Sequence, residues 1–262
     1  MIKYSSTLTA ASRPFFVLFP ALLLAWGSTA AAQGPSDSSV LSPSYQGSAF
    51  DIERNVPAYS EEHVEKMADG VQVGTRTVYM APGGGPMAIR TLDFSHSPLK
   101  PDYLFKDVRN GYEEGSRQEA GVMHVHFRDN SAAPLREKSI TVPEPCVVNG
   151  GVGNFVKEHW VDLASGSRLA FNMVVPARLD YFRFRAYRDV KKNLPEKETA
   201  GRKSQAIVIE PQSSVLRMLL PTIIMYYDVK TLRLVRYQGI VNVADPKGRS
   251  LRVRVDYPGL GP

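Results

Sequence analysis

The sequence predicts a mainly β fold of the α+β class: a curved antiparallel sheet or half-barrel with a few short helices packed against it. Three observations support this prediction. Apolar and polar residues alternate with a period of two through most of the second half of the chain. The connections between these runs are short and contain Gly, Pro, Asp or Asn. Few segments show helical spacing, whereas a parallel sheet would need a crossover helix for each strand.

The composition is that of a globular protein. The chain has 262 residues, of which 43% are hydrophobic and 22% charged, and this excludes a collagen-like repeat and wholesale disorder. The single cysteine, Cys146, cannot form an internal disulfide framework or a Cys-rich metal centre. It lies in the apolar segment Val-Pro-Glu-Pro-Cys-Val-Val, so we expect a packed and unreactive side chain.

Residues 1–32 have the pattern of a secretory signal peptide. Their only charges are Lys3 and Arg13, an apolar run ends at Trp26, and small residues precede a predicted cleavage after Ala32. The apolar run is about 12 residues long, whereas a membrane-spanning helix takes about 20. We therefore expect an exported protein of the periplasm, soluble rather than membrane-spanning; an uncleaved anchor is the alternative.

Beyond the leader, the sequence predicts two regions. Residues 33–49 are small and polar, which is typical of a flexible lead-in. Residues 50–262 are enough for a single β-rich domain with a substantial core. Cleavage would leave 30 basic and 26 acidic groups, so the net charge falls from +6 to +4. This mild excess does not indicate nucleic acid as a partner.

The first elements of the domain are predicted to be a helix and a hairpin. Ser60 can cap a short helix that runs to Met67, with acids in its first turn. The runs Val71–Met80 and Met87–Phe94 are strand-like and flank the Gly/Pro cluster at 81–86. This cluster is predicted to be a simple turn, because a phosphate-binding loop would be followed by a helix rather than by a proline and a strand.

The middle of the chain is predicted to be less regular. Residues 95–118 are polar and interrupted by proline, so we expect a long loop or a short element whose position the sequence does not fix. Strands are expected at Gly121–Arg128 and Ser139–Val142. A helix is expected from Asn154 to Ala164, because its apolar residues have helical spacing and Gly166 follows as a stop.

The second half is predicted to be a meander of strands. One or two amphipathic helical turns are expected at Ser213–Pro221. The predicted strands are Arg168–Val175, Tyr181–Arg188, Lys203–Glu210, Ile223–Asp228, Leu232–Ile240 and Ser250–Tyr257.

The polar side of two of these strands is rich in arginine and tyrosine. We predict an anion-binding or partner-binding face at Arg183, Arg185, Tyr187, Arg252 and Arg254. Arginine donates paired hydrogen bonds to phosphates and carboxylates, and tyrosine offers a stacking surface. The alternative is a solvated sheet face on which the arginine stems cover apolar surface.

The apolar side of the sheet also allows two interpretations. A strongly curved sheet closed by helices can enclose an acyl chain, or the same side chains can simply fill a core. The candidate lining residues are Phe182, Phe184, Leu216, Leu219, Ile224 and Tyr226.

The sequence contains no catalytic motif. His124 and His126 fall on the same side of a strand, a spacing that can bind a metal, but local spacing identifies no third ligand, so we predict neither a metal site nor a cofactor. A Gly-x-Ser-x-Gly elbow, a His-Glu-x-x-His helix and a nucleotide-binding loop are all absent from the sequence. We therefore name no catalytic residue and lean towards a non-enzymatic protein.

The last third of the chain carries a family resemblance. Residues 225–239 form a Tyr-x-Asp … Thr-x-x-Leu pattern, and residues 250–257 follow as a last strand that ends in Asp-Tyr. This tail resembles uncharacterised exported bacterial β-proteins, and is also similar to the half-barrel lipoprotein carriers of the periplasm and the DUF3108-like group. The resemblance implies a curved antiparallel sheet with helices in its mouth, which in some members cups a lipid.

Three functional hypotheses follow. The first is a non-enzymatic periplasmic protein that binds or carries a lipid or acyl chain. The second is a structural or assembly partner of a cell-envelope complex, which would use the Arg/Tyr-rich face. The third is a hydrolase whose active-site residues are dispersed in the sequence.

Overall fold

The computed structural model describes residues 40–41, 45–245 and 248–258, which all belong to one unit of the chain, Ser38–Pro262. The predicted signal peptide at 1–32 lies outside the described residues, as does most of the predicted lead-in at 33–49. Strand β2 begins at Tyr45, so regular structure starts within the segment predicted to be flexible.

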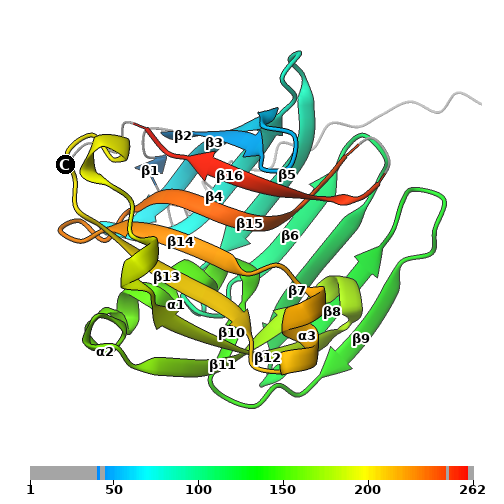
Figure 1. Cartoon of the computed structure of the whole chain (residues 1–262). Helices are drawn as coiled ribbons and strands as arrows, with labels where there is room; N and C mark the ends of the chain where they lie inside the picture. The colour runs from blue at the N-terminus through cyan, green and yellow to red at the C-terminus, as the bar shows by residue number, and fades with distance from the viewer. Residues whose placement is uncertain (1–39, 42–44, 246–247, 259–262) are drawn as a thin grey trace, which may run out of the picture. The chain divides into compact units, whose positions relative to one another are not determined.

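The described residues form one large sheet with a few short helices, so the predicted fold class is confirmed (Figure 1). Its hydrogen-bonded path is β10-β11-β12-β13-β14-β15-β16-β2-β3-β4-β5-β6-β7-β8-β9, and β1 pairs with β3. The last strand, β16, therefore lies beside the early strand β2. The pairs are antiparallel as predicted, except that β10 runs parallel to β11.

The elements alternate between strands and short helices only in the middle of the chain. The strands before the helices are β1 (Val40–Leu41), β2 (Tyr45–Asp51), β3 (Val56–Ala68), β4 (Val71–Met80), β5 (Pro86–Asp93), β6 (Asp102–Asp107), β7 (Glu113–Glu119), β8 (Val122–Arg128), β9 (Arg136–Ile140) and β10 (Cys146–Val148). The later strands are β11 (Arg168–Val175), β12 (Asp180–Arg188), β13 (Ser204–Pro211), β14 (Ile223–Asp228), β15 (Leu234–Ala244) and β16 (Ser250–Asp256). The helices are η1 (Asn149–Gly151), α1 (Val152–Glu158), α2 (Trp160–Ser165), η2 (Pro176–Arg178), η3 (Val190–Lys192), η4 (Glu196–Glu198) and α3 (Ser214–Leu219).

The sheet rolls over on itself. Asn242 of β15 donates from Nδ2 to the hydroxyl of Tyr103 on β6 at 2.8 Å and also bonds the carboxylate of Glu114 on β7. In the sheet, β16 and β2 to β5 separate β15 from β6, so this contact crosses the interior. The turn η2 also packs against β7 and β8. The sheet does not close by hydrogen bonds, because β9 and β10 are the two ends of its path.

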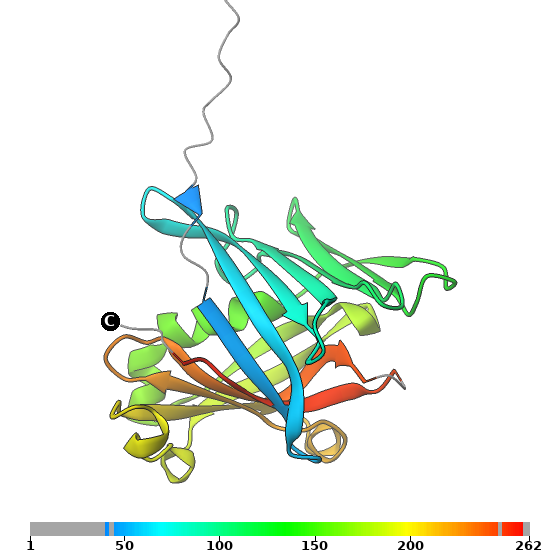
Figure 2. The same cartoon turned by 90° about the horizontal axis from the view of Figure 1, so that it is seen from above.

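Two hydrophobic clusters fill the interior. The larger one gathers inward side chains of β2 to β6, of β8 to β11 and of β15 and β16, including Phe105 and Val125. The second joins Phe155 and Leu163 of the helices to Phe171 and other inward residues of β11 to β14. Figure 2 shows α1 between the early strands and the late strands. The side chains of the helices therefore pack inside the rolled sheet and occupy its interior, as expected for close-packed proteins.

The predicted helix at Ser60–Met67 is wrong, because this segment belongs to strand β3. On β3 the inward positions are Tyr59, Glu61 and His63, and all three are buried. Two of these inward residues are polar, so the apolar alternation that marks a strand is missing from the sequence.

Of the two alternatives for 95–118, the long loop is wrong, because the segment contains β6 and most of β7, two strands where at most one short element was expected. Strand β6 alternates as expected of a half-buried strand, with Tyr103 and Phe105 inside. On β7, however, the buried inward residues are Glu114 and Ser116, which again conceal the strand pattern.

The helix predicted at Asn154–Ala164 is present as two short helices. Helix α1 ends at Glu158, and His159 leaves the helical conformation (φ −101°, ψ 22°) before α2 begins at Trp160. Gly166 ends α2 in the left-handed conformation at φ 102°, as its position after the helix predicts.

Candidate functional site

The register of the sheet brings the predicted Arg/Tyr residues to one outer face. On β12, Arg183, Arg185 and Tyr187 point away from the cluster that α1 and α2 cover. Paired residues on neighbouring strands lie on the same face of a sheet. Following the pairs from β12 through β13, β14 and β15 to β16 therefore places Arg252 and Arg254 on this outer face as well. We call these five residues the arginine face.

Carboxylates neutralise most of the arginine face. The ion pairs are Arg185 with Glu210, Arg254 with Asp256 at 2.9 Å and, at a longer 3.9 Å, Arg252 with Glu53. Arg183 differs, because its side chain is exposed and its Nε donates to the uncharged Oε1 of Gln212 at 2.6 Å. Arg183 is therefore the member of this face whose charge is most available to a partner.

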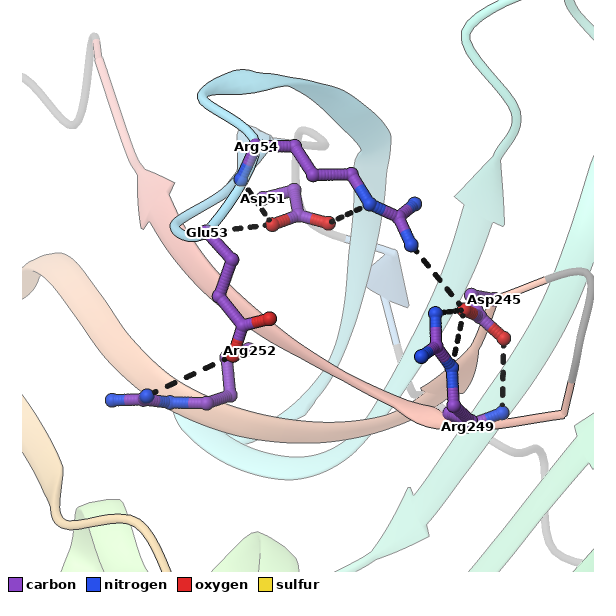
Figure 3. Close-up of polar contacts among 6 residues, drawn as sticks. All are labelled: Asp51, Glu53, Arg54, Asp245, Arg249 and Arg252. Carbon is purple, nitrogen blue, oxygen red and sulfur yellow. Dashed lines mark hydrogen bonds and ion pairs between the residues drawn. The ribbon is translucent and has the colours of Figure 1, made fainter.

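A charged network beside Arg252 has a structural role (Figure 3). Asp51 accepts hydrogen bonds from two backbone N–H groups of the β2–β3 turn. Arg54 lies between Asp51 and Asp245, at 3.8 Å and 3.6 Å, and Arg249 donates from both Nε and Nη2 to Asp245. The network thus ties the β2–β3 turn to the end of β15, so we do not assign it to ligand binding.

Helix α3 exposes apolar side chains next to the arginine face. Val215 is 59% exposed, Met218 is 80% exposed and Leu220, just after the helix, is 38% exposed. Ser213 caps the helix by accepting from the backbone N–H of Leu216. Arg217 fixes α3 to the end of β13, because its Nη1 donates to the carbonyls of residues 211 and 212 at 3.1 and 2.7 Å.

The predicted apolar site is not one surface in the structure. Phe184 is buried against α1 and α2, with Phe182 partly buried beside it. Ile224 and Tyr226 lie on the opposite side of the sheet, in a third cluster with Ala206 and Val235. Leu216 and Leu219 belong to α3. The structure therefore divides the six residues between packed core and the α3 region.

The structure contains a groove that sequence analysis missed. It has a volume of about 760 Å³, and most of its lining residues alternate with the buried residues of β5 to β9, which places it on the outward side of these strands. Two rows of cross-strand neighbours form it, as the pairs between these strands show. One row is Thr91–Leu104–Gly115–His126–Glu137, in which every residue except Gly115 lines the groove. The other is Asp93–Asp102–Arg117–His124–Ser139, in which Asp102 and Arg117 are one position beyond the pair Tyr103–Ser116.

Gly115 lets His126 lie close against the sheet. A Cβ atom at this position would lie 2.6 Å from the backbone oxygen of Tyr103 and 2.4 Å from Cε1 of His126. Only glycine therefore fits here without a shift, because the ring of His126 occupies the space that a side chain would take. The sequence signal was a glycine inside a strand, which often marks close approach of another group.

The two histidines singled out from the sequence both line this groove. His126 lies 3.6 Å from Glu113, and Nδ1 of His124 lies 3.0 Å from the hydroxyl of Ser139. Among the described residues, no group of three His, Cys, Asp or Glu side chains could hold a metal ion. In the same part of the chain no carboxylate contacts His124, so the Ser–His pair lacks the orienting acid of a catalytic triad.

A directional chain of polar contacts is buried inside the sheet. Arg90 can only donate, so its bond to Thr77 Oγ1 (3.2 Å) lets Thr77 donate its own proton to Nδ1 of His63 (3.1 Å). The Nε2–H of His63 then donates to Glu61 (2.8 Å), which also accepts from the hydroxyl of Tyr257 (2.9 Å). Burial alone would raise the pKa of Glu61, but His63 and Arg90 outweigh it and lower that pKa.

This buried row of hydrogen bonds has a structural rather than a catalytic role. Glu61 is 4% exposed, His63 is 2% exposed, and the ring of Tyr45 stacks on His63 with centroids 4.3 Å apart. A substrate has no open path to such a pair. Cys146 is buried as predicted, and burial raises the pKa of its thiol to about 11, so it stays protonated and unreactive.

Glu114 is a second buried acid, with the opposite shift. It accepts hydrogen bonds from the hydroxyls of Tyr103 (2.5 Å) and Tyr112 (2.9 Å). Burial raises the pKa of Glu114 above its ordinary value of 4.5, because these hydrogen bonds do not offset the cost of burying the charge.

We predict that Glu114→Gln reduces the loss of stability on raising the pH. A raised pKa contributes stability that is fully present below 4.5 and lost as the pH rises through the folded-state pKa. Glutamine does not titrate, so the fall in melting temperature from about pH 5 to about pH 8 should be smaller in the variant than in the wild type. The lowered pKa of Glu61 changes the stability only below pH 4.5, so it does not affect the comparison between pH 5 and pH 8.

Glu119→Gln is the control, because Glu119 is an exposed acid on the same strand. Its pH profile should match that of the wild type. An unchanged pH profile in Glu114→Gln would contradict the shift assigned to Glu114.

None of the helices among the described residues has the length and apolar content needed to span a bilayer.

Comparisons with known proteins add one structural likeness. No protein-family model and no curated protein matches the chain, so the resemblance of the tail to DUF3108-like carriers gains no support. Among solved structures, the chain is similar to the crystal structure of a β-barrel-like protein of a domain of unknown function, DUF1849, from Brucella abortus. The TM-score is 0.40 at 9% identity, with 82% of this chain and 96% of that chain covered, and a likeness of this size carries no argument about function.

Proposed function

We propose that this chain is an exported, non-enzymatic protein of the bacterial cell envelope, and that it binds an anionic lipid surface through α3 and Arg183. Export is proposed from the signal-peptide pattern of residues 1–32. The observation that carries the lipid proposal is the exposure of Val215, Met218 and Leu220 near the arginine face, on which Arg183 has an available charge.

The chemistry of this region suits the boundary between lipid headgroups and acyl chains. Exposed apolar side chains on a short helix gain free energy when they enter that boundary. Each basic residue near an anionic surface adds about 1 kcal/mol of attraction. Arg183 has no carboxylate partner among the described residues and can supply this attraction directly.

Binding at the surface is favoured over an acyl chain held inside the sheet. Phe184 packs against Phe171, with ring centroids 6.2 Å apart, and Phe171 packs against Phe155 of α1 at 4.7 Å. These side chains already have partners, so an acyl chain would have to displace them. The exposed side chains of α3 need no such displacement.

We predict that the protein cosediments with phosphatidylglycerol vesicles far more than with phosphatidylcholine vesicles. Replacing both Val215 and Met218 with serine should weaken binding by about tenfold or more, because each apolar side chain gains more than 1 kcal/mol on burial. Arg183→Gln should weaken it by about fivefold, with a smaller dependence on salt.

Val161→Ser is the matched control. Val161 is 80% exposed, as Met218 is, but lies on α2. It should bind vesicles like the wild type. The lipid proposal is wrong if the protein cosediments with neither kind of vesicle. It is also wrong if the α3 variant and the Val161 variant bind vesicles equally. A protein partner for the arginine face would then be the better explanation.

A further inference from the structure

The groove over β5 to β9 has carboxylates at one end and nitrogen donors towards the other. Asp93 and Asp102 face each other across β5 and β6. Arg117 and His124 face each other across β7 and β8. All four side chains line the groove, and Glu137 of β9 lines it beyond His126.

The acidic end lacks an internal counter-ion for one of its two carboxylates. Two hydrogen bonds from Ser95 hold Asp93, and Lys66 and His96 lie near it. Asp102 has no hydrogen-bond or ion-pair partner in the described part of the chain. Like charges directly opposite each other in a sheet are unfavourable, so a cation bound between these carboxylates would relieve the repulsion.

The other end can receive an anion. Arg117 pairs with Glu119 at 3.1 Å, but both side chains are more than 60% exposed, at 64% and 65%, and an exposed pair of this kind is weak. The guanidinium therefore keeps donors for a carboxylate. His124 uses Nδ1 for Ser139, which leaves Nε2 for a ligand.

The separation of the two ends sets the length of the ligand. The centre of the acidic pair and the centre of the Arg–His pair are two strand spacings apart, about 9.5 Å at 4.7–4.9 Å for each spacing. Three extended residues span about 10 Å at a rise of about 3.3 Å. Leu104, two residues from Asp102 on β6, also lines the groove and can contact a small side chain of the ligand.

We infer that this groove is a binding site for a short peptide with free termini, about three residues long, whose ammonium group sits at Asp93 and Asp102 and whose carboxylate sits at Arg117 and His124. The volume of about 760 Å³ is within the range of small-ligand sites. The groove is built from β5 to β9 and does not include α3, so this inference does not depend on the lipid proposal.

Calorimetric titration with tri-alanine tests the inference. The peptide should bind, and either N-acetylation or C-amidation should weaken it by about tenfold, because hydrogen bonds to a charged group are worth about 1.5–3 kcal/mol. Dialanine should also bind more weakly, since its termini cannot reach both ends at once. Equal affinities for tri-alanine and its capped forms, or no binding of tri-alanine, would overturn the inference.

Two variants assign the ends separately. Asp102→Asn should lower the affinity for tri-alanine but have little further effect on the affinity for the N-acetylated peptide. Arg117→Gln should lower the affinity for tri-alanine but have little further effect on the affinity for the C-amidated peptide. Such ligand-specific coupling cannot arise from a general loss of structure. Glu62→Gln is the control, because Glu62 is an exposed acid outside the groove and should leave every titration unchanged. A uniform loss of affinity for all peptides in both groove variants would contradict the assigned orientation.

Discussion

Replacing Glu61 with alanine is expected to lower the free energy of unfolding by about 3–5 kcal/mol, the cost of removing one partner from a buried charged pair. Without this carboxylate, His63 and Tyr257 each keep a buried donor with no acceptor. Arg90 also loses the favourable charge interaction with this buried carboxylate. Since Tyr257 follows the last strand, the variant additionally loosens the contact between the C-terminal strand and β3.

Urea unfolding of the wild type and two variants provides the measurement. Glu62→Ala is the matched control, because Glu62 is the next residue on β3 and points to solvent, so its effect should stay within about 0.5 kcal/mol. If Glu61→Ala is no more destabilising than Glu62→Ala, the buried hydrogen bonds of Glu61 do not hold β3 in place.

The second large effect is expected for Gly151→Ala. A Cβ atom at Gly151 would lie 2.1 Å from the carbonyl oxygen of Leu99 and 2.6 Å from its carbonyl carbon. These are backbone atoms, and the same oxygen accepts a hydrogen bond from the N–H of Val148. The chain before β6 must therefore move away from β10, and we expect a loss of about 3 kcal/mol, the upper part of the usual range for overpacking.

Gly153→Ala is the control for this variant. Gly153 lies in α1, and the nearest atom to its added Cβ would be the hydroxyl of Tyr227 at 3.9 Å. Alanine should fit and raise stability by about 0.5–1 kcal/mol through its better helix propensity. Similar melting temperatures for the two alanine variants would show that η1 and Leu99 are not in close contact.

Sequence patterns predicted the strands that are rich in β-branched and apolar residues. Val71–Met80, Arg168–Val175 and Ile223–Asp228 were predicted with the bounds that the structure has. Val71–Met80 alternates in part, whereas Ile223–Asp228 is a short, almost continuous apolar run followed by a turn, which also indicates a buried strand. The position of α3 was also predictable, since a serine cap precedes it and a proline follows.

The strands that line the polar interior were not predictable in this way. On β3 and β7 the buried positions carry Glu61, His63 and Glu114. These residues satisfy their hydrogen bonds only after the sheet has rolled and brought distant partners such as Asn242 close. Burial of a polar group depends on such tertiary partners, and one sequence does not reveal them.

The candidate sites show the same division. The arginines of β12 and β16 were predicted as one face, and the register of the sheet brings them to one side. The carboxylates that neutralise most of them come from other strands and were not foreseen. The groove was missed because its charged rows look like ordinary solvated strand faces until the pairing of β5 to β9 is known.

The central claim is that α3 enters an anionic lipid surface, and an environment-sensitive fluorophore at position 218 tests it most directly. Met218→Cys can be labelled selectively, because Cys146 is only 2% exposed. With phosphatidylglycerol vesicles, the label at 218 should shift to the blue and brighten, whereas the same label in Val161→Cys should not change. An unchanged spectrum at 218, or equal shifts at both positions, would contradict the claim.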